Sequence, residues 1–250
     1  NYHIQKNVQS GNYRLLDGNR KRLKLGSYDE CLTELSDLNP TFEHDHLVLL
    51  IHGLGRHAGI MDKPKLALRK SGFSAHSLNY ATLLEGVDDQ ATHFTHLLEN
   101  LKGIKRVSFV THSLGGLVVR EILSRNTHWN DVVADRIVMM GTPNQGAQIA
   151  EFLSRMKSYK FITGQSGQDV RPDQKLATLP EPTIPTLIIA GGIGNDIGFN
   201  PLLTGDNDGV VTVEETRLNG YHQFKQVKVI HTTIMDHDES IKAMLEFISK

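Results

Sequence analysis

Apolar residues along the chain gather in short runs that alternate with segments repeating at helical spacing. The runs that predict buried strands are residues 47–51, 75–80, 107–110, 137–140, 186–190 and 227–230. The segments that predict helices are residues 61–71, 88–101, 114–125, 146–156 and 237–248. Short apolar strands separated by helices are typical of βαβ units. We therefore predict an α/β fold with a mostly parallel central sheet and helices on both faces.

Two stretches depart from this alternation. Around Asp17-Gly18, residues 13–25 are expected to form an antiparallel hairpin at the edge of the sheet. Residues 144–185 combine a helical pattern with a segment rich in Gly, Gln and Pro, and an insertion of this length is either a functional lid or a long surface connection. Its apolar side chains are expected either to line a substrate cleft or to pack on the sheet; they are Phe152, Met156, Tyr159 and Phe161.

The expected organisation is a single domain over residues 1–250, with an N-terminal extension over 1–45 and the lid-like insertion over 144–185. A chain of 250 residues is long enough for one sizeable core. A formal net charge of −1 argues against a nucleic-acid binder, which would carry a basic stripe. The short basic run Arg20-Lys21-Arg22 is expected to be a solvated hairpin.

The single cysteine, Cys31, allows no intrachain disulfide, which is compatible with a cytoplasmic or a periplasmic protein. Cys31 is expected to be a small buried hydrophobic residue. No apolar run approaches the roughly 20 residues of a membrane helix. The chain begins Asn1-Tyr2-His3, without Met and without a signal pattern. We expect a mature form that lacks any upstream signal or anchor, so membrane association would come only through the substrate or through such a segment.

The candidate chemistry centres on Thr111-His112-Ser113-Leu114-Gly115-Gly116. This stretch ends an apolar run and starts a helical pattern, and a serine on such a turn is typical of the nucleophile elbow of serine hydrolases. The turn exposes the hydroxyl and points the free N–H groups of the helix at charge that forms on a substrate. Small residues are needed two positions before and after the serine. Gly115 meets this need, whereas Thr111 departs from the usual glycine.

A serine nucleophile needs a base within hydrogen-bond reach and an acid that orients the base. We predict Asp208 as the acid, because the stretch 208–211 leads directly into the next apolar segment; Asp206 is the alternative. We predict His231 as the base, because it directly follows the last expected strand. His237 is the alternative base, but Asp236 with Glu239 beside it predicts an N-cap and capping box for the final helix.

An oxyanion hole needs two backbone N–H groups. We expect one from Leu114, the residue after the serine, and the other from Leu54, in the turn after the first core strand. Gly53 allows the close backbone approach that this turn requires. His52 is expected to fix the turn by hydrogen bonds, and Arg56 is expected either to contact substrate or to be solvated.

Together these residues resemble the lipase and esterase branch of the α/β-hydrolase superfamily. The chain is similar in particular to bacterial serine lipases and to lipase-like proteins related to the inositol deacylase of lipid anchors. The matching stretches run from about residue 47 to the C-terminus, in the order that this superfamily shows; they are residues 52–55, 111–116, 141–146, 207–211 and 231–232. The resemblance implies an α/β-hydrolase fold, with Ser113, Asp208 and His231 as nucleophile, acid and base.

The expected activity is hydrolysis of a small-molecule ester or a lipid through an acyl-enzyme on Ser113. The same three residues would also serve an acyltransferase, or a hydrolase of amides or thioesters. A third alternative is a non-catalytic binding protein, because function is not determined by fold alone.

No cofactor and no metal is expected. Residues 190–195 resemble a dinucleotide loop, but they lack the third glycine at the right offset and no clear helix follows. The histidines of His44-Asp45-His46, and His93 with His96, have metal-like spacing without a third or fourth ligand, so surface or helix-face positions are expected. Asp206 and Asp208 do not complete a set of cation ligands.

Overall fold

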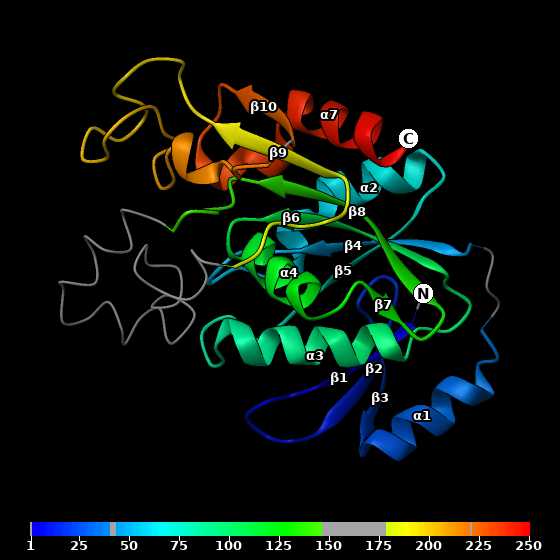
Figure 1. Cartoon of the computed structure of the whole chain (residues 1–250). Coiled ribbons are helices and arrows are strands. Elements are labelled where there is room, and N and C mark those ends of the chain that lie inside the picture. Colours follow the sequence, from blue (N-terminus) through cyan, green and yellow to red (C-terminus); the bar gives the residue numbers. More distant parts are fainter. Residues whose placement is uncertain (1, 41–43, 147–178, 221) are drawn as a thin grey trace. The chain divides into compact units, whose positions relative to one another are not determined.

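The computed structural model describes residues 2–40, 44–146, 179–220 and 222–250 (Figure 1). The chain divides into two compact units, residues 1–43 and 44–250. The expected single domain with an extension over 1–45 and a lid-like insertion over 144–185 stays a prediction. Most of that insertion lies outside the described residues, and so does the predicted helix over 146–156 after its first residue. Phe152, Met156, Tyr159 and Phe161 also lie outside them.

The first unit is a three-stranded antiparallel sheet followed by a helix. Its elements are β1 (Tyr2–Lys6), β2 (Tyr13–Asp17), β3 (Arg22–Gly26) and α1 (Tyr28–Asp37). The predicted hairpin is present, and Asp17 stabilises its turn because its Oδ1 accepts the N–H groups of Asn19 and Lys21 at 2.8 and 2.9 Å. Its predicted place at the edge of the main sheet is wrong, since β2 pairs with β1 on one side and β3 on the other.

The helix of this unit was not expected from the apolar pattern, although its start has a clear local signal. Ser27 is the N-cap, and Ser27 and Glu30 form a capping box in which each side chain accepts the backbone N–H of the other residue. Cys31 is the buried residue of this helix, as expected.

The second unit contains a seven-stranded sheet in the order β10-β9-β8-β6-β4-β5, with β7 paired to β8. All neighbours along this order are parallel, and only β7 runs antiparallel. The strands are β4 (His46–Ile51), β5 (Ser74–Leu78), β6 (Arg106–His112), β7 (His128–Trp129), β8 (Val132–Met140), β9 (Thr186–Gly191) and β10 (Gln223–Val227). The predicted mostly parallel sheet is therefore confirmed.

Helices cover both faces of this sheet (Figure 1). One face packs against α3 (Val87–Glu99) and α4 (Leu114–Arg125), with Phe94 and Leu117 among the shared core residues. The other face packs against α2 (Asp62–Lys70) and α7 (Asp238–Ile248), with Leu68 and Phe247 in the second core cluster. Because both faces are covered, the central strands are apolar on both sides, which explains their continuous apolar runs.

The last strand does not lie where the apolar run predicts it. Residues 227–230 were expected to form it, whereas β10 spans Gln223–Val227 and shares only Val227 with that run. The reason is its place at the sheet edge, where only Val227 of the strand is buried and the apolar signal is weak. Val229, which is buried, belongs to the loop after the strand.

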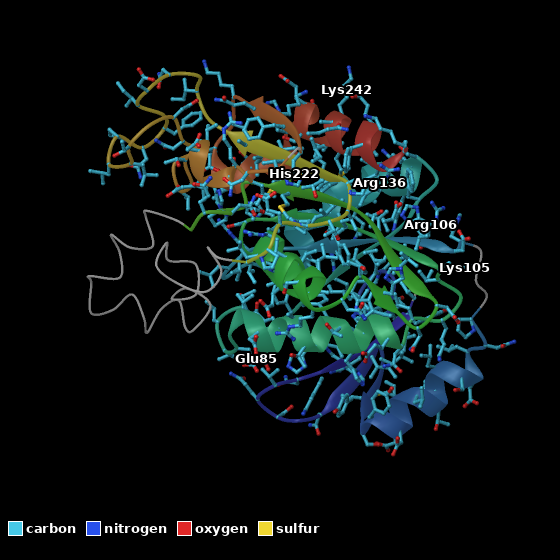
Figure 2. All side chains as sticks on the ribbon, in the orientation of Figure 1. Glu85, Lys105, Arg106, Arg136, His222 and Lys242 are labelled. Carbon is cyan, nitrogen blue, oxygen red and sulfur yellow. The ribbon has the colours of Figure 1, made fainter. Side chains whose placement is uncertain are left out.

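The carboxyl ends of the parallel strands meet at one edge of the sheet, so the loops that follow them lie together. Arg106 is the first residue of β6 and lies at the opposite edge of the sheet (Figure 2). Ser113 follows the last residue of the same strand and therefore lies at the carboxyl edge. Among the described helices, none is long and apolar enough to cross a membrane.

Candidate active site

Ser113 lies at the junction between β6 and α4 in a conformation that residues with a side chain rarely adopt. Its φ is 53° and its ψ is −124°. The backbone is held there because the N–H of Ser113 donates to the carbonyl of Met140, at the end of β8, at 2.9 Å. A strained residue between a strand and a helix is the geometry expected of a nucleophile elbow, which turns the hydroxyl away from the sheet.

Two glycines allow the backbones around this serine to approach closely. A Cβ at Gly115 would lie 2.5 Å from the carbonyl oxygen of Ile51 and 2.8 Å from that of His52. A Cβ at Gly53 would lie 2.9 Å from the Cβ of Ser113. The loop after β4 therefore packs directly on the first turn of α4, and any side chain at Gly115 would separate the two.

Thr111, where the family pattern has glycine, is accommodated inside the strand. The residue is fully buried in β6, and its hydroxyl donates to the carbonyl of Val138 on the neighbouring strand at 3.1 Å. A threonine fits here because its polar atom has a partner, so the departure from glycine leaves the turn at Ser113 intact.

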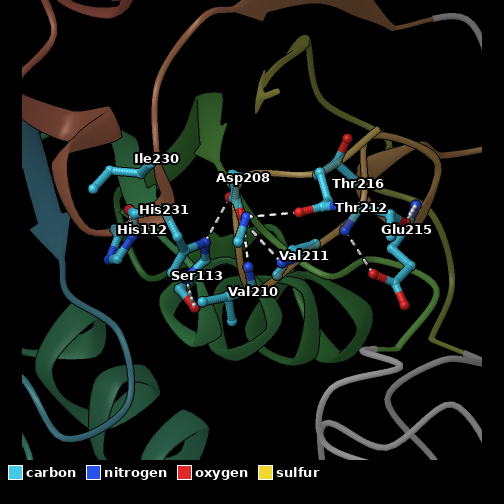
Figure 3. Close-up of polar contacts among 12 residues, drawn as sticks. His112, Ser113, Asp208, Val210, Val211, Thr212, Glu215, Thr216, Ile230 and His231 are labelled. Atoms are coloured by element: carbon cyan, nitrogen blue, oxygen red, sulfur yellow. Dashed lines mark hydrogen bonds and ion pairs between the residues drawn. The ribbon is translucent and has the colours of Figure 1, made fainter. Parts of the chain in front are cut away.

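Ser113, His231 and Asp208 form a continuous chain of hydrogen bonds (Figure 3). The Oγ of Ser113 lies 3.0 Å from Nε2 of His231, and Nδ1 of His231 lies 2.7 Å from Oδ2 of Asp208. His231 opens a short 3₁₀ helix (His231–Asp236) after the loop that follows β10. Three residues that are far apart in the sequence thus meet at the carboxyl edge of the sheet.

The second carboxylate oxygen of Asp208 is fixed by its own loop. Oδ1 accepts the backbone N–H groups of Val210 and Val211 at 3.0 and 2.8 Å. The side chain of Asp208 is fully buried, and that of His231 is 9% exposed. Because both acceptor oxygens are used, the carboxylate cannot rotate away from the imidazole without losing backbone hydrogen bonds.

The alternative acid, Asp206, has a different set of partners. Its carboxylate accepts the backbone N–H groups of Ile193 and Gly194, both at 2.8 Å, and the side-chain amide of Gln226. Asp206 therefore clamps the loop after β9 to the edge strand. Asp208, by contrast, contacts the imidazole of His231. The structure therefore places the preferred acid, and not its alternative, beside the predicted base.

The alternative base, His237, occupies the N-cap position of α7. The predicted capping box of Asp236 and Glu239 is wrong, because α7 begins at Asp238 and has no side-chain hydrogen bond at its cap. The 3₁₀ helix extends through Asp236, which displaces the start of α7. Instead, Lys63 donates to the carbonyl of Asp236 and to the carboxylate of Asp238.

The loop that carries Leu54 is held by hydrogen bonds, as expected for His52. Nδ1 of His52 lies 2.9 Å from the carbonyl of Gly53, and the hydroxyl of Tyr80 donates to the carbonyl of His52. Burial lowers the pKa of His52 to about 4, so the ring is neutral and Nδ1 is the nitrogen that donates. The N–H of Gly55 donates to Thr82 at 3.0 Å.

Leu54 follows Gly53 in this loop, and Leu114 is the first residue of α4. Leu114 is therefore the neighbour of Ser113 in the chain. Leu54 is the neighbour of Gly53, which lies in close contact with Ser113. Their N–H groups as the two donors of an oxyanion hole stay a prediction.

Three residues contact the Asp208–His231 pair, although the sequence predicts no such contact for them. A Cβ at Gly141 would lie 3.1 Å from Nδ1 of His231, and a Cβ at Gly191 would lie 2.7 Å from the Cβ of Asp208. His112 contacts the backbone of His231, since its Nε2 lies 3.0 Å from that carbonyl oxygen. The only signal in the sequence is their position, at strand ends next to residues already singled out.

Two of the histidines with metal-like spacing, His46 and His93, have other partners. Nε2 of His46 lies 2.9 Å from the hydroxyl of Ser108, and His93 pairs with Glu85 at 3.1 Å. In the part of the chain that the structure describes, no group of three or more His, Cys, Asp or Glu side chains is placed to hold a metal. The absence of a metal and of a cofactor stays a prediction.

Comparison with known proteins identifies a family that covers most of the chain. A family model described as a PGAP1-like alpha/beta domain matches residues 71–245. No curated protein sequence matches the chain.

Among solved structures, the chain is similar to the mature form of the Bacillus licheniformis lipase BlEst2, with 18% identity and a TM-score of 0.64 over 83% of this chain and 95% of that one. It is similar to the metagenomic carboxyl esterase MGS0156, with 15% identity and a TM-score of 0.64 over 83% and 75%. It is also similar to a structure from work on the carboxylesterases of Nitrososphaera gargenis, with 14% identity and a TM-score of 0.59 over 99% of this chain and 98% of that one. The predicted α/β-hydrolase fold and the resemblance to its lipase and esterase branch are confirmed.

Proposed function

The chain belongs to the PGAP1-like alpha/beta domain family, and on this premise we propose that it is a serine hydrolase that cleaves carboxylic esters through an acyl-enzyme. The observation that carries the proposal is the chain of hydrogen bonds from Ser113 through His231 to Asp208. The names of the similar lipase and carboxyl esterase support an ester as the substrate.

In the first half of the reaction, Oγ of Ser113 attacks the carbonyl carbon of the ester. Nε2 of His231, 3.0 Å away, takes the hydroxyl proton as the new C–O bond forms. When the tetrahedral intermediate collapses, the bond to the alcohol breaks and His231 returns the proton to the leaving oxygen. The product of this half is an alcohol and an acyl group esterified to Ser113.

In the second half, a water molecule replaces the alcohol. His231 takes a proton from the water as it attacks the acyl carbon. When the second tetrahedral intermediate collapses, the bond between the acyl carbon and Oγ of Ser113 breaks, His231 returns the proton to Oγ, and the carboxylic acid leaves. The carboxylate of Asp208 stabilises the imidazolium formed at each stage and keeps Nδ1 protonated, because Oδ2 accepts from that nitrogen at 2.7 Å.

The negative charge on the carbonyl oxygen requires donors placed before the reaction begins. We assign this role to the N–H groups of Leu54 and Leu114, which flank the close contact of Gly53 with Ser113. Each such donor is worth on the order of 3 kcal/mol in the transition state. The hydrogen bonds of His52 and Tyr80 keep the Leu54 loop rigid.

The test is reaction with a fluorophosphonate probe and with p-nitrophenyl esters of graded chain length. We expect the adduct on Ser113 by mass spectrometry, with labelling and ester hydrolysis lost in Ser113→Ala and His231→Ala. Matched controls are Ser124→Ala, an exposed serine on the same helix, and His93→Ala on α3. Activity that persists in Ser113→Ala, or an adduct elsewhere, would overturn the proposal. The absence of both labelling and hydrolysis in the unchanged protein would favour a binding role.

A further inference from the structure

His112 precedes the serine in the sequence, yet it stands outside the chain that joins Ser113, His231 and Asp208. Its side chain is buried, with 2% of the residue exposed. Nε2 of His112 lies 3.0 Å from the carbonyl oxygen of His231, and the two imidazole rings are tilted with centroids 4.8 Å apart. A carbonyl oxygen only accepts hydrogen bonds, so Nε2 carries the proton and donates it.

This hydrogen bond completes the attachment of His231. The backbone N–H of His231 donates to the carbonyl of Asp208 at 2.9 Å, and the two ring nitrogens contact Asp208 and Ser113. The carbonyl of His231 makes no hydrogen bond with Asp208 or Ser113 and instead accepts from His112. Its partner comes from β6, the strand that ends next to the serine, so one residue ties the base to the element that carries the nucleophile (Figure 3).

The charge of His112 bears on the same reaction. Burial holds the pKa of His112 well below its usual value, and the nearby positive forms of His231 and Arg56 lower it further. The ring is therefore neutral. A second positive ring beside His231 would oppose the imidazolium that forms during proton transfer, whereas a neutral ring does not.

The other ring nitrogen of His112, Nδ1, makes no competing hydrogen bond in the part of the chain that the structure describes. Nδ1 is buried without a hydrogen-bond partner among the described residues. It faces the backbone at Gly53, where a Cβ would lie 3.2 Å from it. Leaving one buried nitrogen unpaired has a cost, which the hydrogen bond at Nε2 must offset for a histidine to be favourable here.

We propose that His112 is a positioning residue, which donates its Nε2–H to the carbonyl of His231 and so sets the separation between the base and Ser113. The inference rests on the proposed function for its effect on rate. The contact itself is a property of the folded chain and has consequences that do not depend on any substrate.

The test compares His112→Gln, His112→Phe and His112→Asn in the whole chain. The side-chain amide of Gln places a donor near the position of Nε2, the ring of Phe keeps the shape without a donor, and the shorter amide of Asn does not reach the carbonyl. His76→Phe, at a buried histidine of β5, is the control for the general cost of replacing a buried imidazole.

We expect kcat for a p-nitrophenyl ester to fall on the order of 10- to 100-fold in His112→Phe and His112→Asn, with KM unchanged, because the backbone of the base is then no longer tied to β6 and the base can move. His112→Gln is expected to stay within about threefold of the original kcat, since the donor is kept. His76→Phe is expected to lower the melting temperature without this change in kcat. The split between kcat and KM and the recovery by Gln separate positioning from stability.

A second readout is the downfield proton NMR signal of the Nδ1–H of His231, assigned by its loss in His231→Ala. We expect it to shift or broaden in His112→Phe and His112→Asn and to persist in His112→Gln and His76→Phe. An unchanged signal together with unchanged kcat in His112→Phe overturns the proposal, as does a Gln variant that behaves like Phe. If Ser113→Ala retains full activity, the proposed hydrolase function fails, while the NMR signal still decides the role of His112.

Discussion

Asp208 and His231 are joined twice, once through their side chains and once through their backbones. Oδ2 of Asp208 lies 2.7 Å from Nδ1 of His231, and the N–H of His231 donates to the carbonyl of Asp208 at 2.9 Å. The position of the imidazole relative to the carboxylate is therefore set by the path of two loops, and not only by side-chain rotamers. A change at either loop is expected to move the pair as one unit.

The first prediction concerns the carboxylate. In Asp208→Asn the remaining oxygen can accept from Val210 and Val211, so the amide N–H₂ faces His231 and favours the tautomer with Nδ1 unprotonated. Nε2 then carries a proton and cannot accept one from Ser113. We expect kcat to fall about 10³- to 10⁴-fold with the fold retained, measured by ester hydrolysis and thermal unfolding.

Asp206→Asn is the matched control, because Asp206 clamps Ile193 and Gly194 and does not contact His231. We expect it to lower the melting temperature and to leave kcat within a few fold. Equal losses of kcat in the two variants would contradict the assignment of Asp208 as the acid.

The second prediction concerns the contact between Gly53 and Ser113. In Gly53→Ala the new Cβ would lie 2.9 Å from the Cβ of Ser113 and 3.3 Å from the carbonyl oxygen of His112, so the loop or the serine must shift. A displacement of this kind is expected to lower kcat roughly 100-fold. Gly55→Ala, in the same loop, has open space around its Cβ but a φ of 64°, so it should lose stability with a much smaller loss of kcat. The opposite order would show that the contact at Gly53 is not critical.

The third prediction asks whether Thr111 serves the reaction or the fold. Its hydroxyl donates to the carbonyl of Val138 inside the sheet. Thr111→Val keeps the shape and removes the donor, so we expect the free energy of unfolding to fall by about 1 kcal/mol with kcat unchanged. Urea unfolding and ester hydrolysis measure the two effects. A large loss of kcat at unchanged stability would assign Thr111 to the active site instead.

The sequence predicts the centre of the fold better than its edges. The strands β4, β6, β8 and β9 are covered on both faces and appear as continuous apolar runs, and α4 begins and ends at the predicted residues. The edge strand β10 has only one buried residue and therefore no apolar run of its own, so the apolar run 227–230 after it wrongly predicts the strand. In the first unit, β1 and α1 lie outside the alternation that guided the prediction.

The same distinction applies to the site. Ser113, Asp208 and His231 were identified from their order and from the strand ends that they follow, and the structure brings the three side chains together. The contact of His112 with His231 joins residues that are 119 positions apart through a backbone carbonyl. A backbone acceptor has no residue type, so no pattern in a single sequence could indicate it.

The last prediction concerns pH. The pKa of His52 is about 4 in the folded chain because the ring is buried, against about 6.5 for an exposed histidine. Between these values the unfolded chain binds a proton that the folded chain does not, so stability is present above about pH 6.5 and is lost as the pH falls toward 4. For His52 alone the free energy of unfolding should decrease by about 2 kcal/mol between pH 7 and pH 5. The burial of His112 acts in the same direction.

Urea unfolding at a series of pH values measures how steeply the free energy of unfolding changes with pH. The variant His52→Asn keeps a donor near the position of Nδ1 for the carbonyl of Gly53, and its free energy of unfolding should depend less steeply on pH. Equal slopes in the two proteins would mean that His52 becomes protonated without unfolding the loop that it holds.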